Sequence, residues 1–81
     1  EHIFILKSDF SNSQMNNIEI SLSWFQLASF YNTSMTGGTF DYITFIENDF
    51  TDTNLENTTI KNLRDIGDNN FSCKNNAICI K

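Results

Sequence analysis

Large apolar side chains recur at every fifth position along the first three quarters of the chain. The series runs without insertion or deletion through Ile5, Phe10, Met15, Ile20, Phe25, Phe30, Met35, Phe40, Phe45, Phe50, Leu55 and Ile60. The residue two positions before each of these is small in most repeats, as at Ser8, Ala28 and Thr53. The repeating unit is therefore small–polar–large–polar–polar, and it continues from Ile3 to Asn62.

A period of five residues fits neither an α-helix nor an ordinary strand. A helix advances about 100° per residue, so the large side chains would scatter around its circumference. In a strand, they would point alternately to opposite faces. A backbone that turns by roughly 90° in each repeat resolves this conflict, because four repeats then close a square coil with every large side chain on its axis. Stacked coils would hydrogen-bond at the strand spacing of about 4.8 Å.

Residues twenty positions apart are expected to lie above one another in such a stack. The four inward columns would be Ile5/Phe25/Phe45, Phe10/Phe30/Phe50, Met15/Met35/Leu55 and Ile20/Phe40/Ile60. Every column is apolar throughout, as a square coil requires. Ile3, Ile18 and Ile43 are the bulkiest residues at the small positions. The pattern predicts an all-β chain folded as a right-handed quadrilateral β-helix of about three coils.

The repeat resembles that of the pentapeptide-repeat family. Thr53-Asn54-Leu55-Glu56-Asn57 and Ala28-Ser29-Phe30-Tyr31-Asn32 are similar to its consensus of Ala, then Asp or Asn, then Leu or Phe, then two polar residues. The chain departs from the consensus in having few Ala and many Ser, Thr and Asn residues. The resemblance implies the same square β-helix. It also implies a role as a surface within larger proteins, including secreted bacterial effectors, some of which carry a ubiquitin-ligase domain.

The repeat loses its phase after Asn62, because Asp65 and Asn70 stand where large apolar residues are due. We therefore predict a β-helix over residues 1–62 and a C-terminal cap over residues 63–81; the alternative is the start of another domain. The predicted cap consists of a short helical turn over Lys61–Gly67, then strands at Phe71–Cys73 and Ile78–Ile80 in a hairpin-like arrangement. Cys73 and Cys79 could form a disulfide or remain reduced structural cysteines.

The start of the repeat and the net charge each indicate something about the protein's context. The repeat is in phase almost from Glu1 with no cap before it, so we expect a fragment of a larger protein with further material upstream. The net charge of −5 disfavours binding to nucleic acid or to anionic membranes, and no apolar run is long enough for a membrane span.

Residues for catalysis, for metal binding or for a cofactor are not expected. The chain has one histidine, His2, and it lies far from both cysteines in sequence, so neither a metal site nor an activated thiol is indicated. Acidic residues gather in one stretch: Asp41, Glu47, Asp49, Asp52 and Glu56. We interpret these as solvated outer positions of the repeat, because a convex coil provides no cleft for paired carboxylates.

The outward positions predict one apolar side. Large apolar residues collect around the column of Ile5, namely Phe4, Leu6, Leu22, Trp24, Leu27, Tyr42 and Ile46, whereas the side around Met15 has none. A contiguous exposed patch of this kind usually marks a partner surface. We predict that it is a protein interface for an adjacent domain, a target protein or a second subunit in a homodimer. The alternative is that loops or termini of the same chain cover it.

These observations predict a non-catalytic interaction or scaffold module, such as part of a cytoplasmic or secreted bacterial effector. The alternative function is a DNA mimic that binds DNA gyrase, as in the quinolone-resistance members of the family that the repeat resembles. Those members are longer and acidic along their length, whereas three coils span only about 15 Å at the strand spacing. The predicted function therefore remains protein binding.

Overall fold

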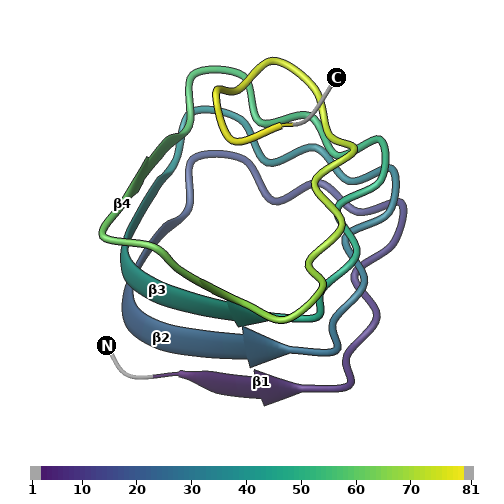
Figure 1. Ribbon diagram of the computed structural model, residues 1–81. Coiled ribbons are helices and arrows are strands. Elements are labelled where there is room, and N and C mark those ends of the chain that lie inside the picture. The colour runs from purple at the N-terminus through teal and green to yellow at the C-terminus, as the bar shows by residue number, and fades with distance from the viewer. Residues whose placement is uncertain (1–2, 80–81) are drawn as a thin grey trace.

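The computed structural model describes residues 3–79, and every regular element among them is a strand. The strands are β1 (Phe4–Leu6), β2 (Glu19–Gln26), β3 (Thr39–Ile46), β4 (Thr59–Lys61) and β5 (Arg64–Ile66). All pairings are parallel, in the order β1-β2-β3-β4 with β5 also on β3. The strands stack along two neighbouring sides of a solenoid of about three turns (Figure 1).

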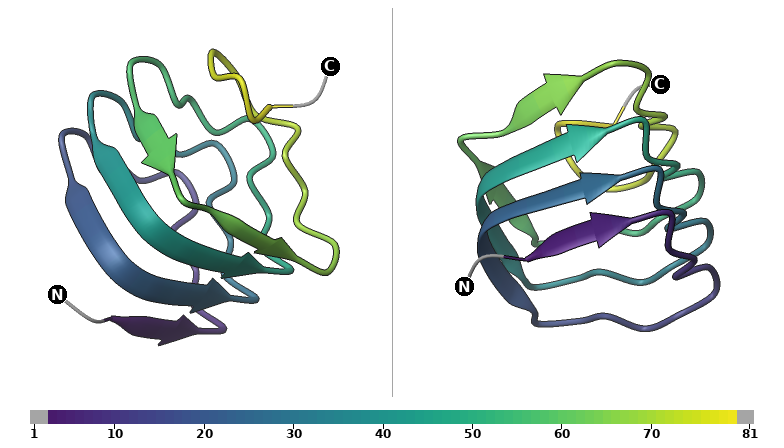
Figure 2. Two further views of the ribbon diagram at one scale, coloured as in Figure 1. Left: turned by 60° about the vertical axis from the view of Figure 1, so that its left-hand side comes forward. Right: turned by 90° about the horizontal axis from the view of Figure 1, so that it is seen from below.

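The pairing register confirms the twenty-residue coil. Phe4 pairs with Trp24, and Trp24 with Thr44, while single parallel bridges such as Ser29 to Asp49 continue the stack on the other sides. In the right-hand view of Figure 2, the strands of the near side run from left to right as the coils ascend, so the coil is right-handed. The prediction of an all-β, right-handed solenoid is therefore confirmed.

The backbone turns once in every five residues. A positive φ, between 53° and 73°, recurs at Lys7, Asn12, Asn17, Leu22, Leu27, Asn32, Gly37, Tyr42, Glu47, Asp52, Asn57, Asn62 and Gly67. These residues form four corner columns, and all but Gly67, which follows Asp65, lie two positions after a large inward side chain. Asn, Asp and Gly adopt this left-handed conformation at least cost, and they fill eight of these thirteen corners.

The core is a set of stacked side chains along the solenoid axis. The rings of Phe10, Phe30 and Phe50 stack almost in parallel, with centroids 5.2 and 4.9 Å apart. Phe30 and Phe50 are fully buried, together with Phe45 and Leu55 in the neighbouring columns. Offset-stacked rings add to the free energy gained from burial alone, so these columns stabilise the short coil.

Buried threonines fill the small positions next to the large side chains. The hydroxyl of Thr33 donates to the carbonyl of Phe10 at 2.6 Å, and that of Thr53 donates to the carbonyl of Phe30 at 2.5 Å. Gly38 occupies the column of Ile18, where a Cβ atom would lie 2.4 Å from the Ile18 carbonyl oxygen. The small residues thus allow close packing between coils, and the threonines add a hydrogen bond to the coil before.

The predicted helical turn over Lys61–Gly67 is wrong. Residues 64–66 form β5, which continues the solenoid by pairing with residues 44–46 of β3. Asp65 therefore lies above Phe45 in the register, but its side chain is exposed. The coil tolerates this polar residue because no further described coil covers it.

The predicted hairpin is also wrong. One extra residue follows Gly67, so Asp49 bridges to Asn70, and the ring of Phe71 stacks on Phe50 at 5.3 Å. The shift is removed again by the bridge between Asn54 and Lys74, and both bridges are parallel. Residues 70–74 are therefore a continuation of the coil. Ile80, at the end of the predicted second strand, lies outside the described residues.

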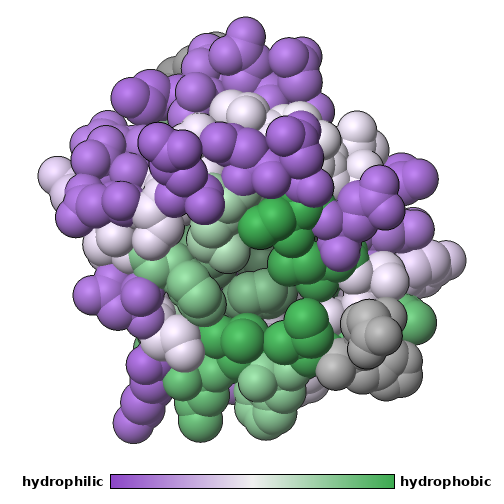
Figure 3. All heavy atoms as spheres, turned by 180° about the vertical axis from the view of Figure 1, so that it is seen from behind, coloured by the Kyte–Doolittle hydropathy of each residue, from purple (hydrophilic) through white to green (hydrophobic). Residues whose placement is uncertain are grey.

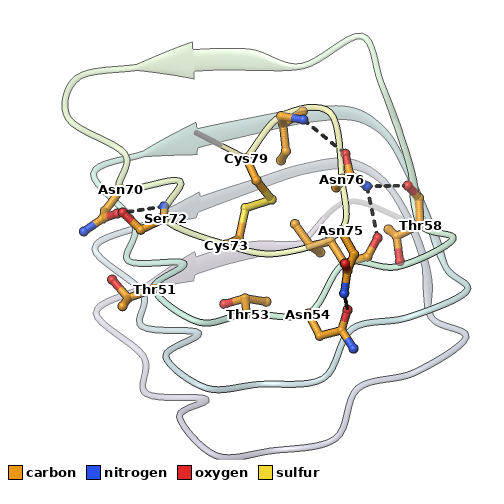
Figure 4. Close-up of a disulfide and its surroundings, with 12 residues drawn as sticks. Thr51, Thr53, Asn54, Thr58, Asn70, Ser72, Cys73, Asn75, Asn76 and Cys79 are labelled. Atoms are coloured by element: carbon orange, nitrogen blue, oxygen red, sulfur yellow. Dashed lines mark hydrogen bonds between the residues drawn. A yellow bond between two sulfur atoms is a disulfide. The ribbon is translucent and has the colours of Figure 1, made fainter. Parts of the chain in front are cut away.

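A disulfide-closed turn covers the last coil. Cys73 and Cys79 are bonded, with Cα atoms 5.0 Å apart, which decides between the two alternatives for these cysteines. Within the loop, the side-chain amide of Asn76 donates to the carbonyls of Leu55 and Thr58 at 3.1 and 2.8 Å (Figure 4). These bonds hold the turn over the Leu55 column, so the core is covered at this column.

Candidate protein-interaction face

The predicted interface residues lie on the side of the solenoid formed by β1, β2, β3 and β5. Six are exposed: Phe4, Leu6, Leu22, Trp24, Leu27 and Tyr42. Phe4 is 66% exposed and Tyr42 59% exposed, which is high for side chains of this size. Ile46 is only half-buried, and Ile66 in the next coil is exposed beside it in the register. These eight residues are called the apolar face below.

The aromatic part of this face is ordered by contacts across two coils. Phe4 and Trp24 are register partners, and their ring centroids are 5.6 Å apart at 59°. The indole Nε1 of Trp24 donates to Oε1 of Gln26 at 3.2 Å, so the polar edge of the ring is satisfied. Together with Ile3 and Leu22, the two rings line a hollow of about 360 Å³.

A second hollow opens one coil further along. It has a volume of about 370 Å³ and is lined by Tyr42, Ile43, Thr44, Asn62, Leu63 and Arg64. Thr44 is only 8% exposed, whereas Tyr42 at the adjacent corner projects outward. Arg64 supplies a positive charge at the edge of the hollow. The hollow therefore has one aromatic residue, Tyr42, and two aliphatic residues, Ile43 and Leu63, in its lining, beside the polar groups of Thr44, Asn62 and Arg64.

Backbone strain is concentrated at the corners that border the apolar face. The corner residues other than Asn, Asp or Gly are Lys7, Leu22, Leu27, Tyr42 and Glu47. All five belong to two corner columns: Leu22 and Tyr42 lie within β2 and β3, and Lys7, Leu27 and Glu47 directly follow β1, β2 and β3. A residue with a Cβ atom pays of the order of 1 kcal/mol for this conformation. In the fourth coil the same two columns return to Asn62 and Gly67, so the unfavourable residues accompany the face.

Three exposed apolar residues are not among those predicted from the sequence. Ile3 and Ile66 extend the face at its two ends, and Ile66 lies in the segment predicted as a helical turn. Tyr31, 44% exposed, lies on a different side, in the bridge region that follows Ser29. Reading the register past Asn62 would have found Ile66, because it is twenty residues after Ile46.

The carboxylates of the acidic stretch are not arranged as a metal-binding site in the part of the chain that the structure describes. Within residues 3–79, no group of three or more His, Cys, Asp or Glu side chains could hold a metal ion. Asp49 accepts hydrogen bonds from the amide and hydroxyl of Thr51, at 2.9 and 2.6 Å, in a local turn. Asp41 accepts from the side-chain amide of Asn62 at 2.8 Å. These carboxylates are used in the solenoid's own hydrogen bonding.

The carboxylate of Asp9 has a lowered pKa. Hydrogen bonds from Ser11, first from its side chain and then from its backbone amide, lower the pKa of Asp9 below its ordinary value. The amide of Ser11 lies 2.9 Å from Oδ1 of Asp9. A lowered pKa means that this contact stabilises the fold at neutral pH and that its contribution is lost as the pH falls through the folded-state pKa. The group is fully exposed, which is consistent with a structural turn.

Comparison with known proteins adds no relative. No family model matches the chain, and no curated protein is significantly similar to it. Among residues 3–79 there is no helix of the length and apolarity needed to cross a membrane. The strand pairing shows a parallel β-solenoid, and assignment to a particular repeat family depends on the sequence pattern.

Proposed function

We propose that the chain is a protein-binding module of the pentapeptide-repeat type, and that a protein partner binds its apolar face. The observation that supports this most strongly is the strain at Leu22, Leu27 and Tyr42. These corners would be more stable with Asn or Gly, yet they carry large apolar side chains that are exposed to solvent. Strain that is retained at an exposed position is typical of functional surfaces.

The composition of the face supports the same proposal. Trp24 and Tyr42 are residue types that most often anchor protein interfaces, and each borders a hollow that could receive a partner side chain. The disulfide between Cys73 and Cys79 favours an oxidising compartment, and so a secreted role over a cytoplasmic one. A module within a secreted effector agrees with both points.

Site-specific photo-crosslinking tests the proposal. A benzophenone amino acid at position 24 is expected to cross-link a discrete partner in cells of the source organism, and the same amino acid at position 31 is not. Tyr31 is the matched control, because it is an exposed aromatic residue away from the apolar face. Tyr42→Asp should remove the cross-link while the circular dichroism spectrum stays native. Equal cross-linking from positions 24 and 31 would contradict the proposal.

The DNA-mimic alternative predicts a different result. It requires inhibition of DNA supercoiling by gyrase, with the acidic positions as the binding determinants. Asp41 and Asp49, two residues of the predicted acidic stretch, accept hydrogen bonds from their own solenoid. A supercoiling assay with the full chain separates the two functions, since the protein-binding module should leave gyrase unaffected.

A further inference from the structure

The two hollows of the apolar face occupy equivalent places in the solenoid. Tyr42, in the second hollow, belongs to the same corner column as Leu22, in the first. Arg64 pairs with Thr44, which in turn pairs with Trp24. The first hollow lies between the first two coils and the second between the third and fourth. They are therefore two coils apart, which is about 10 Å along the solenoid axis at the strand spacing.

The surface between the two hollows is uneven. Trp24 is 39% exposed and Tyr42 projects further, whereas Thr44 is nearly buried and forms a low point after the indole ring. Apolar side chains gather at the centre and lower edge of the molecule in Figure 3, and β1, β2 and β3 lie toward this lower edge in Figure 1. These outward positions stay on the same side whatever coil stacks against the edge of β1.

A spacing of about 10 Å between two recesses selects one type of partner element. In an α-helix, side chains seven residues apart are separated by about 10.5 Å along the axis and by only about 20° around it. In an extended strand, side chains on one face repeat every 6.8 Å or so, which gives roughly 7 or 14 Å. A helix that lies along the solenoid axis can therefore fill both hollows at once, whereas a strand misses one of them by about 3 Å.

We propose that the partner element bound by the apolar face is an amphipathic α-helix of another protein, with apolar side chains at positions i and i+7 in the two hollows. This inference rests on the proposed function, because it gives the structure of the partner at the same face. A second copy of the part of this chain that the structure describes does not supply the element, since residues 3–79 contain no helix.

The charge beside the second hollow sets the direction of the bound helix. Arg64 is exposed at its edge and forms no ion pair with any residue that the structure describes. The C-terminal end of a helix carries a partial negative charge, so this end lies toward Arg64. An acidic residue at i+11 is on the same side of the helix as the two anchors, one turn beyond the second, and pairs with the guanidinium.

The length of such a helix agrees with the size of the solenoid. From i to i+11 it comprises about 12 residues and is roughly 18 Å long. The molecule measures 25 by 22 by 21 Å, so the helix stays on the face over its whole length.

The fluorescence of Trp24 provides the test, because it is the only tryptophan of the chain and lines the first hollow. The probe is an alanine-based peptide of about 16 residues, stapled in the helical form, with Leu at i and i+7 and Glu at i+11. The control peptide has the same composition, with the second Leu at i+9, on the opposite side of the helix. We expect a saturable blue shift and roughly tenfold tighter binding of the first peptide, since the control buries one Leu fewer.

Charge reversal tests the direction of the helix. Arg64→Glu should weaken binding of the peptide with Glu at i+11 by about threefold, and a peptide with Lys at that position should bind this variant better than the Glu peptide does. Lys74→Glu is the matched control, because it changes the net charge equally at an exposed position bridged to Asn54, away from the apolar face. Circular dichroism of both variants should stay native.

Three results would overturn the inference. The first is equal binding of the peptides with anchors at i+7 and i+9. The second is an effect of Arg64→Glu no larger than that of Lys74→Glu. The third is emission from Trp24 that stays constant up to peptide concentrations on the order of millimolar, where even a weak complex forms.

The outcomes for the two proposals can be told apart. If position 24 still cross-links a discrete protein in cells while the peptides show no preference for the i+7 spacing, protein binding stands and the helical partner is wrong. Equal cross-linking from positions 24 and 31 contradicts the proposed function itself.

Discussion

The backbone amide of Asn48 donates a hydrogen bond to Oδ1 of Asn69 at 2.8 Å, although the two residues are 21 positions apart. One coil earlier, the side chain of Asn48 makes the equivalent bonds. Its Oδ1 accepts from the amide of Ala28 at 2.9 Å, and its Nδ2 donates to the carbonyl of Phe25 at 2.9 Å. Asn69 repeats the second bond too, to the carbonyl of Phe45 at 2.8 Å. The side chains thus keep the coil in register where the sequence gains a residue.

Replacement of Asn48 by Ala should therefore be costly. Asn48 is 2% exposed, and its loss leaves the amide of Ala28 and the carbonyl of Phe25 without these buried partners. We expect a decrease of about 2–4 kcal/mol in the free energy of unfolding, measured by urea denaturation. Gln14→Ala, an exposed change, should lie within about 0.5 kcal/mol of the unmodified chain. Equal midpoints for the two variants would show that the amide bridges contribute little.

The buried threonine hydroxyls give a smaller expected effect. Thr53→Val keeps the shape of the side chain but removes the bond to the carbonyl of Phe30. That carbonyl still accepts from the amide of Thr33 at 3.2 Å, so we expect a loss of only about 1 kcal/mol. Thr53→Ser keeps the hydroxyl, and a thermal melt of both variants separates the hydrogen bond from the methyl packing. A Val variant as stable as the unmodified chain would contradict this reading.

Much of the fold could be predicted from the sequence, because an uninterrupted apolar period reports directly on the geometry of the coil. The stacking of Phe10, Phe30 and Phe50 in one column, for example, can be predicted from their twenty-residue spacing alone. The corner conformation also has a signal in the sequence: Asn or Gly recurs at Asn12, Asn17 and Gly37, each two residues after a large apolar one. Reading those positions as left-handed would have located the turns of these two corner columns.

The tail could not be predicted in the same way. A single extra residue after Gly67 breaks the periodic pattern, while hydrogen bonds from Asn69 and the ring of Phe71 keep the coil intact in space. The disulfide depends on how closely the backbone brings Cys73 and Cys79 together, which spacing in the sequence does not determine. On the apolar face, the exposure of six residues followed from the outward positions, and Ile46 proved half-buried because neighbours on both sides cover it.

Reduction of the disulfide should loosen the far end of the solenoid. In the loop-closure description, a loop of this length contributes about 2 kcal/mol. Cys79→Ser should lower the free energy of unfolding by about that amount, and hydrogen exchange should rise first at the amides of Leu55 and Lys74, which bond within the last coils. Exchange at Phe10, far from the turn, is the internal control. Uniform acceleration at both ends would mean that the turn acts on global stability instead of local closure.

Replacement of strained corner residues should stabilise the fold and weaken binding at the same time. Leu22 has φ 53°, a conformation that Asn adopts more readily, so Leu22→Asn should raise the free energy of unfolding by about 0.5–1 kcal/mol. The same change removes an apolar wall from the hollow beside Trp24, so cross-linking from position 24 should fall. Asn62→Leu, in the same corner column, should be destabilising by a similar amount. If Leu22→Asn stabilises the chain without any loss of cross-linking, the strain at this corner has no role in partner binding.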